Sequence, residues 1–367
     1  MDFDFSTEAD EAAELAATIL KDLATPERMR AVEADGDRFD HDLWRSLGDA
    51  GLLGLAVPES YGGAGLGLVE ALRVIVEVGR TVAPVPVAPH VACALALAEH
   101  GTDAQRSLWL SGAASRDRVL AAAVSEDTEA LPARPSTTAT RSDDGWVLNG
   151  TKTPVRAGHR ADLLLVTAST PDGVGVFVVE ASARGATTER QRTTDGDVAL
   201  RITFDDVALP AHAHLGDGAA SRLADLLTVT GCAEQLGVTE GALALTAAYA
   251  KVREQFGRPI ATFRAVSQRL ADGYIDTLGQ RLTLWQAARR LGEGRPAEKE
   301  LATAALFAAD AGHRVAHTAV HVHGGVGIDL DGETHRYFTA AKRWEYALSG
   351  TTQSALAIGR SLAAEPV

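Results

Sequence analysis

The first segment of this sequence that could do chemistry runs from Tyr249 to Ile260. Within it, Arg253 and Phe256 come just before Gly257 and Pro259. A planar guanidinium offers paired donors to a phosphate, and a nearby aromatic ring can cover a base or a ribose. The same pattern is also that of an ordinary helix end, where basic residues complement the helix dipole and a glycine ends the helix. The residues alone leave a phosphate site and a plain helix end both open.

The second such segment is a glycine pair that follows a histidine-containing helix. Gly324 and Gly325 come shortly after His321, and adjacent glycines let a backbone approach a pyrophosphate closely. A glycine in the left-handed conformation can also simply end a helix. Histidines stand at positions 313, 317, 321 and 323. Because no Cys, Asp or Glu completes this group at ligand spacing, we predict no metal site.

Both segments must be positioned by helices, because apolar residues recur around them with helical spacing. After about Gly216 the sequence predicts an antiparallel bundle, and two helices show one apolar face each. The faces are Leu270, Tyr274, Leu278, Leu282 and Trp285, and Leu301, Ala305, Ala309, Gly312 and Ala316. We expect both faces to lie in the core. Helices are also predicted from Thr7 to about Gly112.

Between about Val119 and Val207 the pattern changes to short β-type runs separated by turn signals such as Asn149-Gly150. The runs are Val119 to Val124, Trp146 to Asn149, Leu163 to Thr167, Val174 to Val179 and Leu200 to Phe204. They indicate a small antiparallel barrel or sandwich. The fold is therefore expected to be mainly α with a β-domain. We predict an N-terminal helical domain (1–115), a middle β-barrel domain (116–214) and a C-terminal helical bundle (215–367).

The composition is that of an ordinary globular protein of 367 residues, with 46% hydrophobic and 23% charged residues. Its formal net charge of −14 repels polyanions, so we expect no nucleic-acid partner. Cys93 and Cys232 are too few for a disulfide framework, which suits a reducing compartment. The most apolar stretch, Val82 to Ala98, carries three prolines and a histidine, so we expect no membrane span. With no secretory signal in the sequence, a cytoplasmic location is expected.

Four segments, taken together and in order, resemble the acyl-CoA dehydrogenase family. They are Leu52 to Gly65, Trp146 to Lys152, Arg253 to Ile260 and His323 to Gly325. The resemblance covers essentially the whole chain and implies a helical domain, a β-barrel and a four-helix bundle. It also implies FAD as cofactor and α,β-desaturation of an acyl-CoA thioester. In that reaction a carboxylate removes the α-proton and the β-hydride leaves for the flavin.

The catalytic base that this resemblance implies is missing from its usual place. In the family a glutamate commonly stands in a Tyr-Glu-Gly-Thr segment near the C-terminus, where this chain has Ser349. A serine hydroxyl is a poor base without a partner that activates it. Some members carry the glutamate on the helix before the Arg253 equivalent, where this chain has Ala244 and Leu245. Glu240 lies about one turn earlier on roughly the same face, so it is the alternative base.

The residues expected around the flavin ring are changed as well. The family implies a Thr-Glu-Pro-x-Ala-Gly-Ser segment and a Trp-Ile-Thr run, whose hydroxyls and ring hold the isoalloxazine. This chain has Ser125 to Leu131 and Pro154 to Arg156 instead. Pro154 has no amide hydrogen, and Arg156 is too bulky to replace a threonine.

The family also lends residues across its dimer interface to the ADP half of a neighbour's FAD, and these residues are kept. They are Arg253, Phe256, Gly324 and Gly325, together with Arg264 and His321 in place of two usual glutamines. Both replacements can still donate to a phosphate or to adenine. Of the FAD-binding residues that the resemblance implies, this chain therefore lacks only those at the flavin-ring end of the cofactor.

This one-sided loss resembles the base-lacking subunit of actinobacterial heteromeric (α2β2) acyl-CoA dehydrogenases that act on steroid side chains. The similarity is strongest in Gln268 to Asp276, Ala311 to Gly327 and His335 to Phe338. It implies a paralogous partner subunit that supplies the catalytic glutamate, and a steroid side-chain acyl-CoA as substrate. Two alternatives stay open: a homo-oligomeric acyl-CoA dehydrogenase that uses Glu240 as its base, and a non-catalytic structural or ligand-binding member of the fold.

Overall fold

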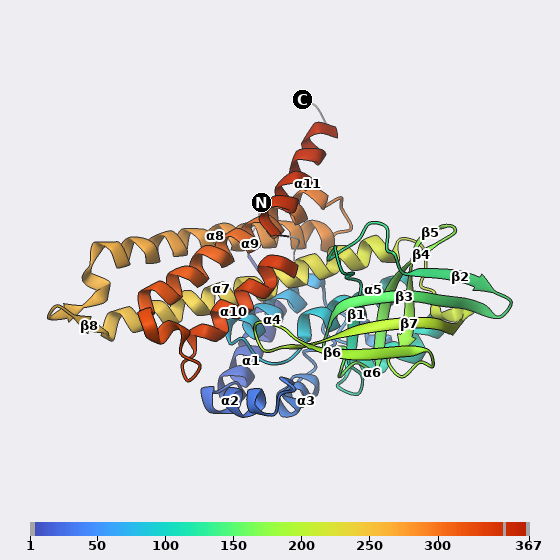
Figure 1. Cartoon of the computed structure of the whole chain (residues 1–367), viewed down its shortest axis with the longest axis horizontal. Helices are drawn as coiled ribbons and strands as arrows, with labels where there is room; N and C mark the ends of the chain where they lie inside the picture. Colours follow the sequence, from blue (N-terminus) through green and yellow to red (C-terminus); the bar gives the residue numbers. More distant parts are fainter. Residues whose placement is uncertain (1–3, 348–349, 365–367) are drawn as a thin grey trace. The chain divides into compact units, whose positions relative to one another are not determined.

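The chain folds as helices, then a β-sheet, then helices again, as the computed structural model shows (Figure 1). The structure describes residues 4–347 and 350–364. Contacts between Cα atoms divide the chain into two compact units. The sheet unit comprises residues 31–71 and 84–230, and the bundle unit comprises residues 1–30, 72–83 and 231–367.

Short capped helices accompany the sheet. α3 (His41–Asp49) begins where the Asp40 carboxylate accepts hydrogen bonds from the backbone N–H groups of Asp42 and Leu43, both at 3.1 Å. α6 (Asp103–Ala114) begins with a capping box between Thr102 and Gln105. The unit also contains α5 (Val87–His100) and the 3-10 turns η1 (Glu59–Tyr61) and η2 (Ala211–Ala213). α2 (Pro26–Ala34) and α4 (Leu68–Arg80) each have residues in both units.

Seven strands form one curled, mixed sheet in the order β1-β4-β2-β3-β7-β6, with β5 paired to β4. They are β1 (Leu120–Ala123), β2 (Thr138–Ser142), β3 (Gly145–Arg156), β4 (Leu163–Thr170), β5 (Gly173–Glu180), β6 (Ala186–Arg192) and β7 (Val198–Pro210). β1 and β2 pair with β4 in parallel, so the expectation of a wholly antiparallel sheet is wrong. The long connections from β1 and β2 to β4 allow these parallel pairings, whereas the other neighbours pair antiparallel.

The interior of the sheet is apolar and aromatic. Trp146 and Phe177 meet edge to face with their ring centroids 5.2 Å apart, in a cluster that also contains Leu148 and Phe204. The register of β3 against β7 shifts between Leu148 and Gly150 and again further along β3. Such irregularities bend a strand, which helps the sheet to curl around this core.

Long helices build the bundle unit (Figure 1). α8 packs against α9, and α9 packs against α10 and α11. The helices are α1 (Thr7–Leu23), α7 (Ala219–Val252, which starts in the sheet unit), α8 (Arg264–Gly292), α9 (Glu298–His323), α10 (Thr334–Ala347) and α11 (Gly350–Ala364). A small hairpin of β8 (Glu254–Gln255) and β9 (Arg258–Pro259) and the turn η3 (Ile260–Thr262) join α7 to α8, and η4 (Gly324–Ile328) follows α9. No helix in the described ranges is long and apolar enough to cross a membrane.

The two helix faces predicted from the sequence have opposite outcomes. The face on α9 is buried as expected, from Leu301 to Ala316. The face on α8 is mostly exposed, because Tyr274 is 64% and Leu278 is 41% accessible, although Trp285 is buried. Up to about its middle α8 turns small and polar residues to the core instead, namely Gly273, Thr277 and Gln280, and a Cβ at Gly273 would come within 3.2 Å of a side chain on α7. Close helix packing therefore selected small residues over the larger apolar ones.

Candidate functional site

The hairpin after α7 carries the first predicted segment. Phe256 and Gly257 form its two-residue turn, with φ values of 54° and 76°, as in the left-handed turns that join tight hairpins. The Phe256 side chain is 92% exposed. The backbone carbonyl of Arg253 accepts a hydrogen bond of 2.8 Å from the N–H of Ile260, while the Arg253 side chain stays exposed. A bulky residue is strained in the left-handed region. At this strained position the aromatic ring of Phe256 is exposed.

The glycine pair after α9 has open space in front of it. Gly324 has φ 66° and ψ −140°, a conformation that glycine adopts far more readily than other residues. A Cβ added at Gly324 or Gly325 would meet no heavy atom within 4 Å. Gly325 also has no positive φ, so neither its backbone conformation nor its packing within this chain requires glycine. Close approach of a ligand to the backbone is a physical reason that remains for having a glycine at position 325.

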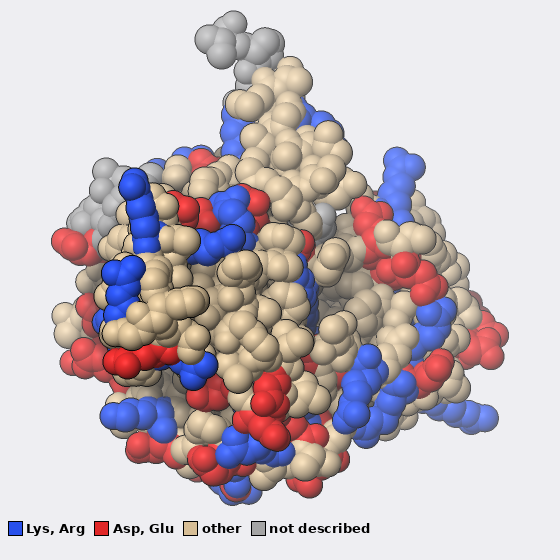
Figure 2. Space-filling view, turned by 60° about the vertical axis from the view of Figure 1, so that its left-hand side comes forward, with Lys and Arg blue, Asp and Glu red and all other residues tan. Residues whose placement is uncertain are grey.

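The two segments lie at one end of the bundle unit. The Tyr249 ring, one turn before Arg253, stacks on the His323 ring with the centroids 4.2 Å apart, which joins the end of α7 to the end of α9. Arg264 is the first residue of α8 and is exposed, as is His321 in the last turn of α9. Figure 2, turned so that the hairpin end comes forward, shows Lys and Arg side chains interspersed with Asp and Glu side chains and with uncharged surface. Exposed cations and an open glycine backbone can together hold a phosphate.

The alternative base, Glu240, lies on α7 and is held by two arginines. Its Oε2 atom is 2.6 Å from Nη2 of Arg80, and Oε1 accepts a hydrogen bond of 3.0 Å from Nε of Arg281. Glu240 and Ala244 line one cavity of about 240 Å3, so they share a face as the spacing predicted. Both carboxylate oxygens are already engaged, which disfavours proton abstraction from a substrate. Ser349 lies outside the described residues.

In the sheet unit, a buried ion pair holds the segment Ser125 to Leu131, where the resemblance had implied residues around a flavin ring. Lys152 is fully buried, and its Nζ donates to Oε1 of Glu126 at 2.8 Å and to the Val124 carbonyl and Thr167 Oγ1 at 3.2 Å each. Glu126 also accepts from Thr137. Burial raises the pKa of Glu126, but hydrogen bonds from Lys152 and Thr137 outweigh it and lower the pKa to about 2. The carboxylate is therefore fixed as a structural acceptor.

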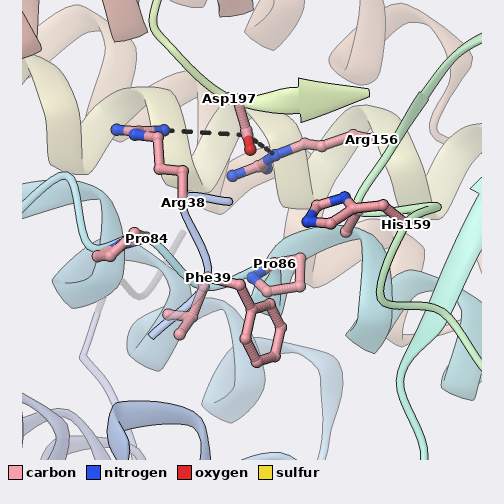
Figure 3. Close-up of a pocket in the computed structure, with 9 residues that line it drawn as sticks. Arg38, Phe39, Pro84, Pro86, Arg156, His159 and Asp197 are labelled. Carbon is pink, nitrogen blue, oxygen red and sulfur yellow. Dashed lines mark hydrogen bonds and ion pairs between the residues drawn. The ribbon is translucent and has the colours of Figure 1, made fainter. Parts of the chain in front are cut away.

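Arg156 does not face open space either. Its Nε donates to Oδ2 of Asp197 at 3.0 Å, and the buried Arg38 lies 3.9 Å from the same oxygen (Figure 3). Arg38 also lies 3.7 Å from Asp195. The cavity among these side chains and His159 is about 10 Å3, room for one water. The end of β3 is therefore occupied by a compact ion-pair cluster rather than by threonine-type hydroxyls.

A larger cavity of about 490 Å3 in the sheet unit was not predicted from the sequence. Its walls are mostly small and apolar, and the loop after β1 and the start of α7 both contribute to it. Val124, Leu131, Thr167, Ser221 and Ala224 are among the lining residues. Two of them, Val124 and Thr167, are also partners of Lys152, so the buried ion pair and this cavity share a wall. No local motif signals a cavity that is assembled from distant small residues.

Family models match the three parts of the chain in order. The N-terminal domain of acyl-CoA dehydrogenase matches residues 6–117, the middle domain residues 121–207 and the C-terminal domain residues 226–361. Together they span nearly the whole chain.

Individual relatives are similar over their full lengths. The acyl-CoA dehydrogenase FadE27 of Mycobacterium tuberculosis is 43% identical, with 100% of each chain covered. A chain in the crystal structure of the ChsE4-ChsE5 complex from the same organism superposes with a TM-score of 0.96 at 44% identity, again with 100% of each chain covered. A chain of the Tcur3481-Tcur3483 steroid ACAD G363A variant gives a TM-score of 0.93 at 44% identity, covering 97% of this chain and 98% of that one.

Proposed function

The chain belongs to the acyl-CoA dehydrogenase family, and we propose that it is a subunit of a heteromeric, FAD-dependent member of that family. In this proposal the chain contributes to FAD binding and assembly, and a paralogous partner supplies the catalytic glutamate and the seat of the flavin ring. The observation that carries the proposal is the contrast between the open bundle end around Gly325 and the ion-paired end of β3 around Arg156.

The bundle end fits the nucleotide half of FAD. Arg253 and Arg264 are exposed there, and each guanidinium can donate two parallel hydrogen bonds to a phosphate. Gly324 and Gly325 leave room for a phosphate to approach the backbone, and Phe256 offers an uncovered ring for stacking. His321, also exposed, completes the set of residues that we propose for binding the ADP half of a neighbour's FAD.

The sheet unit fits the ring half poorly. Pro154 lacks an amide hydrogen, and the Arg156 guanidinium is bound to Asp197 rather than free for a cofactor. Arg38 and Asp195 fill the neighbouring space. A flavin ring placed against this end of β3 would have to break buried ion pairs, which is costly.

The proposal assigns proton abstraction to the partner. Glu240 is engaged by Arg80 and Arg281, and the usual glutamate position carries Ser349. FAD, when bound, supplies the hydride acceptor for α,β-desaturation of an acyl-CoA thioester. The 490 Å3 apolar cavity of the sheet unit supports contact between this chain and an apolar ligand.

Similarity to chains of two-protein complexes supports the heteromeric part of the proposal, and the name of one of them supports a steroid substrate. We therefore propose a steroid side-chain acyl-CoA as the substrate of an α2β2 complex. We place the complex in the cytoplasm, where the buried thiols of Cys93 and Cys232 would stay reduced. The domain division 1–115, 116–214 and 215–367 is part of the same proposal.

The test compares the flavin content of the chain purified alone with that of the chain co-expressed with a paralogous subunit that carries a catalytic glutamate. We expect a colourless lone chain and a yellow complex with one FAD for each pair of unlike chains. Arg253→Ala should lower FAD retention of the complex by about tenfold or more, the effect of losing a charge-assisted phosphate contact. Arg269→Ala, an exposed arginine further along α8, is the matched control.

A yellow lone chain that desaturates an acyl-CoA would refute the proposal and favour a homo-oligomeric enzyme. Absence of flavin from every complex would instead favour a non-catalytic member of the fold.

A further inference from the structure

A pair of stacked rings joins the two segments that lie at the phosphate end of the bundle unit. Tyr249 stands near the end of α7, one turn before Arg253, and His323 is the last residue of α9, directly before Gly324. Their ring centroids are 4.2 Å apart, with an angle of 21° between the ring planes. The two residues are far apart in the sequence, so only the folded bundle brings them together.

The His323 ring is fixed on its own helix. Its Nδ1 atom lies 2.8 Å from the backbone carbonyl of Ala319, one turn earlier on α9. Because a carbonyl oxygen only accepts, Nδ1 carries the hydrogen and donates it. The residue is 9% exposed, and burial lowers the pKa of this imidazole below its ordinary value of 6.5. A neutral ring in a fixed orientation presents a flat face on which a phenol ring can stack.

The stack anchors the start of the hairpin through the backbone. The N–H of Arg253 donates to the Tyr249 carbonyl at 2.9 Å, a hydrogen bond of helical spacing. The Arg253 carbonyl in turn accepts from the N–H of Ile260 at 2.8 Å, which closes the hairpin. Arg253 therefore lies at the junction of α7 and the hairpin, within one turn of the stacked ring.

The stack anchors the glycine pair as well. The N–H of Gly324 donates to the Val320 carbonyl, so the chain leaves α9 directly beside His323. A Cβ added at Gly327 would come within 3.1 Å of the His323 Cβ, which shows that η4 folds back against this histidine. The backbone of Gly324 and Gly325 is therefore held between two contacts with the end of α9.

The residues proposed to meet the phosphates are exposed, so their own burial does not hold them in place; they are Arg253, Phe256, Gly324 and Gly325. A ligand that contacts two separate segments binds more weakly when it must first order them. The Phe256 ring also meets Phe263 edge to face at 6.0 Å, but this contact anchors the hairpin tip to the start of α8. The Tyr249–His323 stack is the ring contact that links the hairpin side of the site to the glycine side.

We propose that Tyr249 and His323 are positioning residues for FAD. Their stack sets the distance between the Arg253 guanidinium and the backbone of Gly324 and Gly325, so that one ADP half contacts both. This inference rests on the proposed role of the chain in FAD binding and identifies what holds that site together. The stack acts through Arg253 and the glycine pair, without a contact of its own to the cofactor.

Cofactor affinities of the heteromeric complex test this inference. Tyr249→Leu removes one ring, and we expect it to weaken FAD binding about fivefold, the size of effect that one aromatic pair can supply. Tyr249→Phe keeps the ring and should bind FAD within about twofold of the wild type. His323→Leu removes the other ring and should match Tyr249→Leu, so the result does not depend on one variant that folds.

Riboflavin separates positioning from structural damage. It lacks the phosphates and the adenosine, so we expect the Tyr249→Leu complex and the wild type to bind it equally well. Tyr337→Leu is the matched control in the same unit, where the tyrosine hydroxyl donates to the Arg80 carbonyl at 2.9 Å. Loss of that hydrogen bond should lower the melting temperature of the complex and leave its FAD affinity unchanged.

A double-mutant cycle tests the route through Arg253. Once its guanidinium is gone, the distance to the glycine pair no longer matters, so Tyr249→Leu combined with Arg253→Ala should bind FAD about as weakly as Arg253→Ala alone. Independent roles would instead multiply the two losses, to about fiftyfold, and overturn the inference.

Two other results would also overturn it: an unchanged FAD affinity for Tyr249→Leu, or equal losses of FAD and riboflavin affinity. Failure of the proposed function looks different, because Arg253→Ala would then leave the FAD affinity unchanged too.

Discussion

The buried lysine of the sheet unit gives the sharpest prediction of stability. Lys152 donates three hydrogen bonds, one of them to the Glu126 carboxylate, and none of its surface is exposed. Lys152→Met keeps the length and apolar stem of the side chain but removes the charge and all three donors. Removing one partner of a buried ion pair typically costs about 3–5 kcal/mol. Glu126 keeps the backbone and hydroxyl donors of Thr137 and the N–H of Ser136, so we expect about 3 kcal/mol, the lower end of that range.

Urea denaturation and calorimetry of the full-length chain measure this loss. For a unit of about 150–250 residues, such as the sheet unit, each kcal/mol of lost stability lowers the melting temperature by roughly 2–4 °C. A decrease of about 6–12 °C is therefore expected. Lys251→Met, at an exposed lysine near the end of α7, is the matched control and should change the stability by about 0.5 kcal/mol or less.

A double-mutant cycle separates the ion pair from general damage. Glu126→Gln combined with Lys152→Met should cost less than the sum of the two single changes. Once either partner has been replaced, the ion pair is already lost, so replacing the second partner removes little more. A loss below about 1 kcal/mol for Lys152→Met, or additive losses in the cycle, would refute the view that this pair holds the wall of the 490 Å3 cavity.

Two further predictions concern the glycine pair and a buried histidine. Gly325→Ala should weaken FAD binding to the heteromeric complex by about tenfold or more. It should leave the melting temperature unchanged, since an added Cβ meets nothing within 4 Å in this chain, and Gly359→Ala is the control. An unchanged FAD affinity of Gly325→Ala would show that no phosphate approaches this backbone. His90 is fully buried between the Ala113 carbonyl and the Leu120 N–H, and burial lowers its pKa from 6.5 to about 4. The unfolded chain therefore binds this proton more readily, so stability should be complete above about pH 6.5 and fall by up to about 3 kcal/mol as the pH decreases to 4. Denaturation curves of the wild type and His90→Gln across this range check the prediction, which fails if both have the same pH dependence.

The sequence predicted the main elements of the fold where residue patterns are local. Each of the five predicted β-type runs coincides with at least part of an observed strand: Val119 to Val124 contains β1, and Trp146 to Asn149 lies within β3. β2 (Thr138–Ser142) and β6 (Ala186–Arg192) were missed, because their sequences are largely polar and their side chains are mostly exposed. A strand that contributes little to the core leaves no alternating apolar pattern to recognise.

The candidate site shows a similar division. Arg253, Phe256, Gly324 and Gly325 could be found from the sequence because glycine, proline and aromatic residues at a helix end form short local patterns. Their role in FAD binding remains a prediction. The partners of Glu240 could not be found in this way, because Arg80 and Arg281 are far from it in the sequence and meet it only through helix packing.

The amino-acid order by itself determined which regions are helical and where most of the strands lie, since turns and apolar periodicity act over a few residues. Tertiary structure alone decided which face of α8 meets the core, that Arg156 is bound by Asp197, and that Glu240 is held between two arginines. Burial and ion pairing depend on which distant side chains come within a few ångströms, and a local pattern carries no information about that.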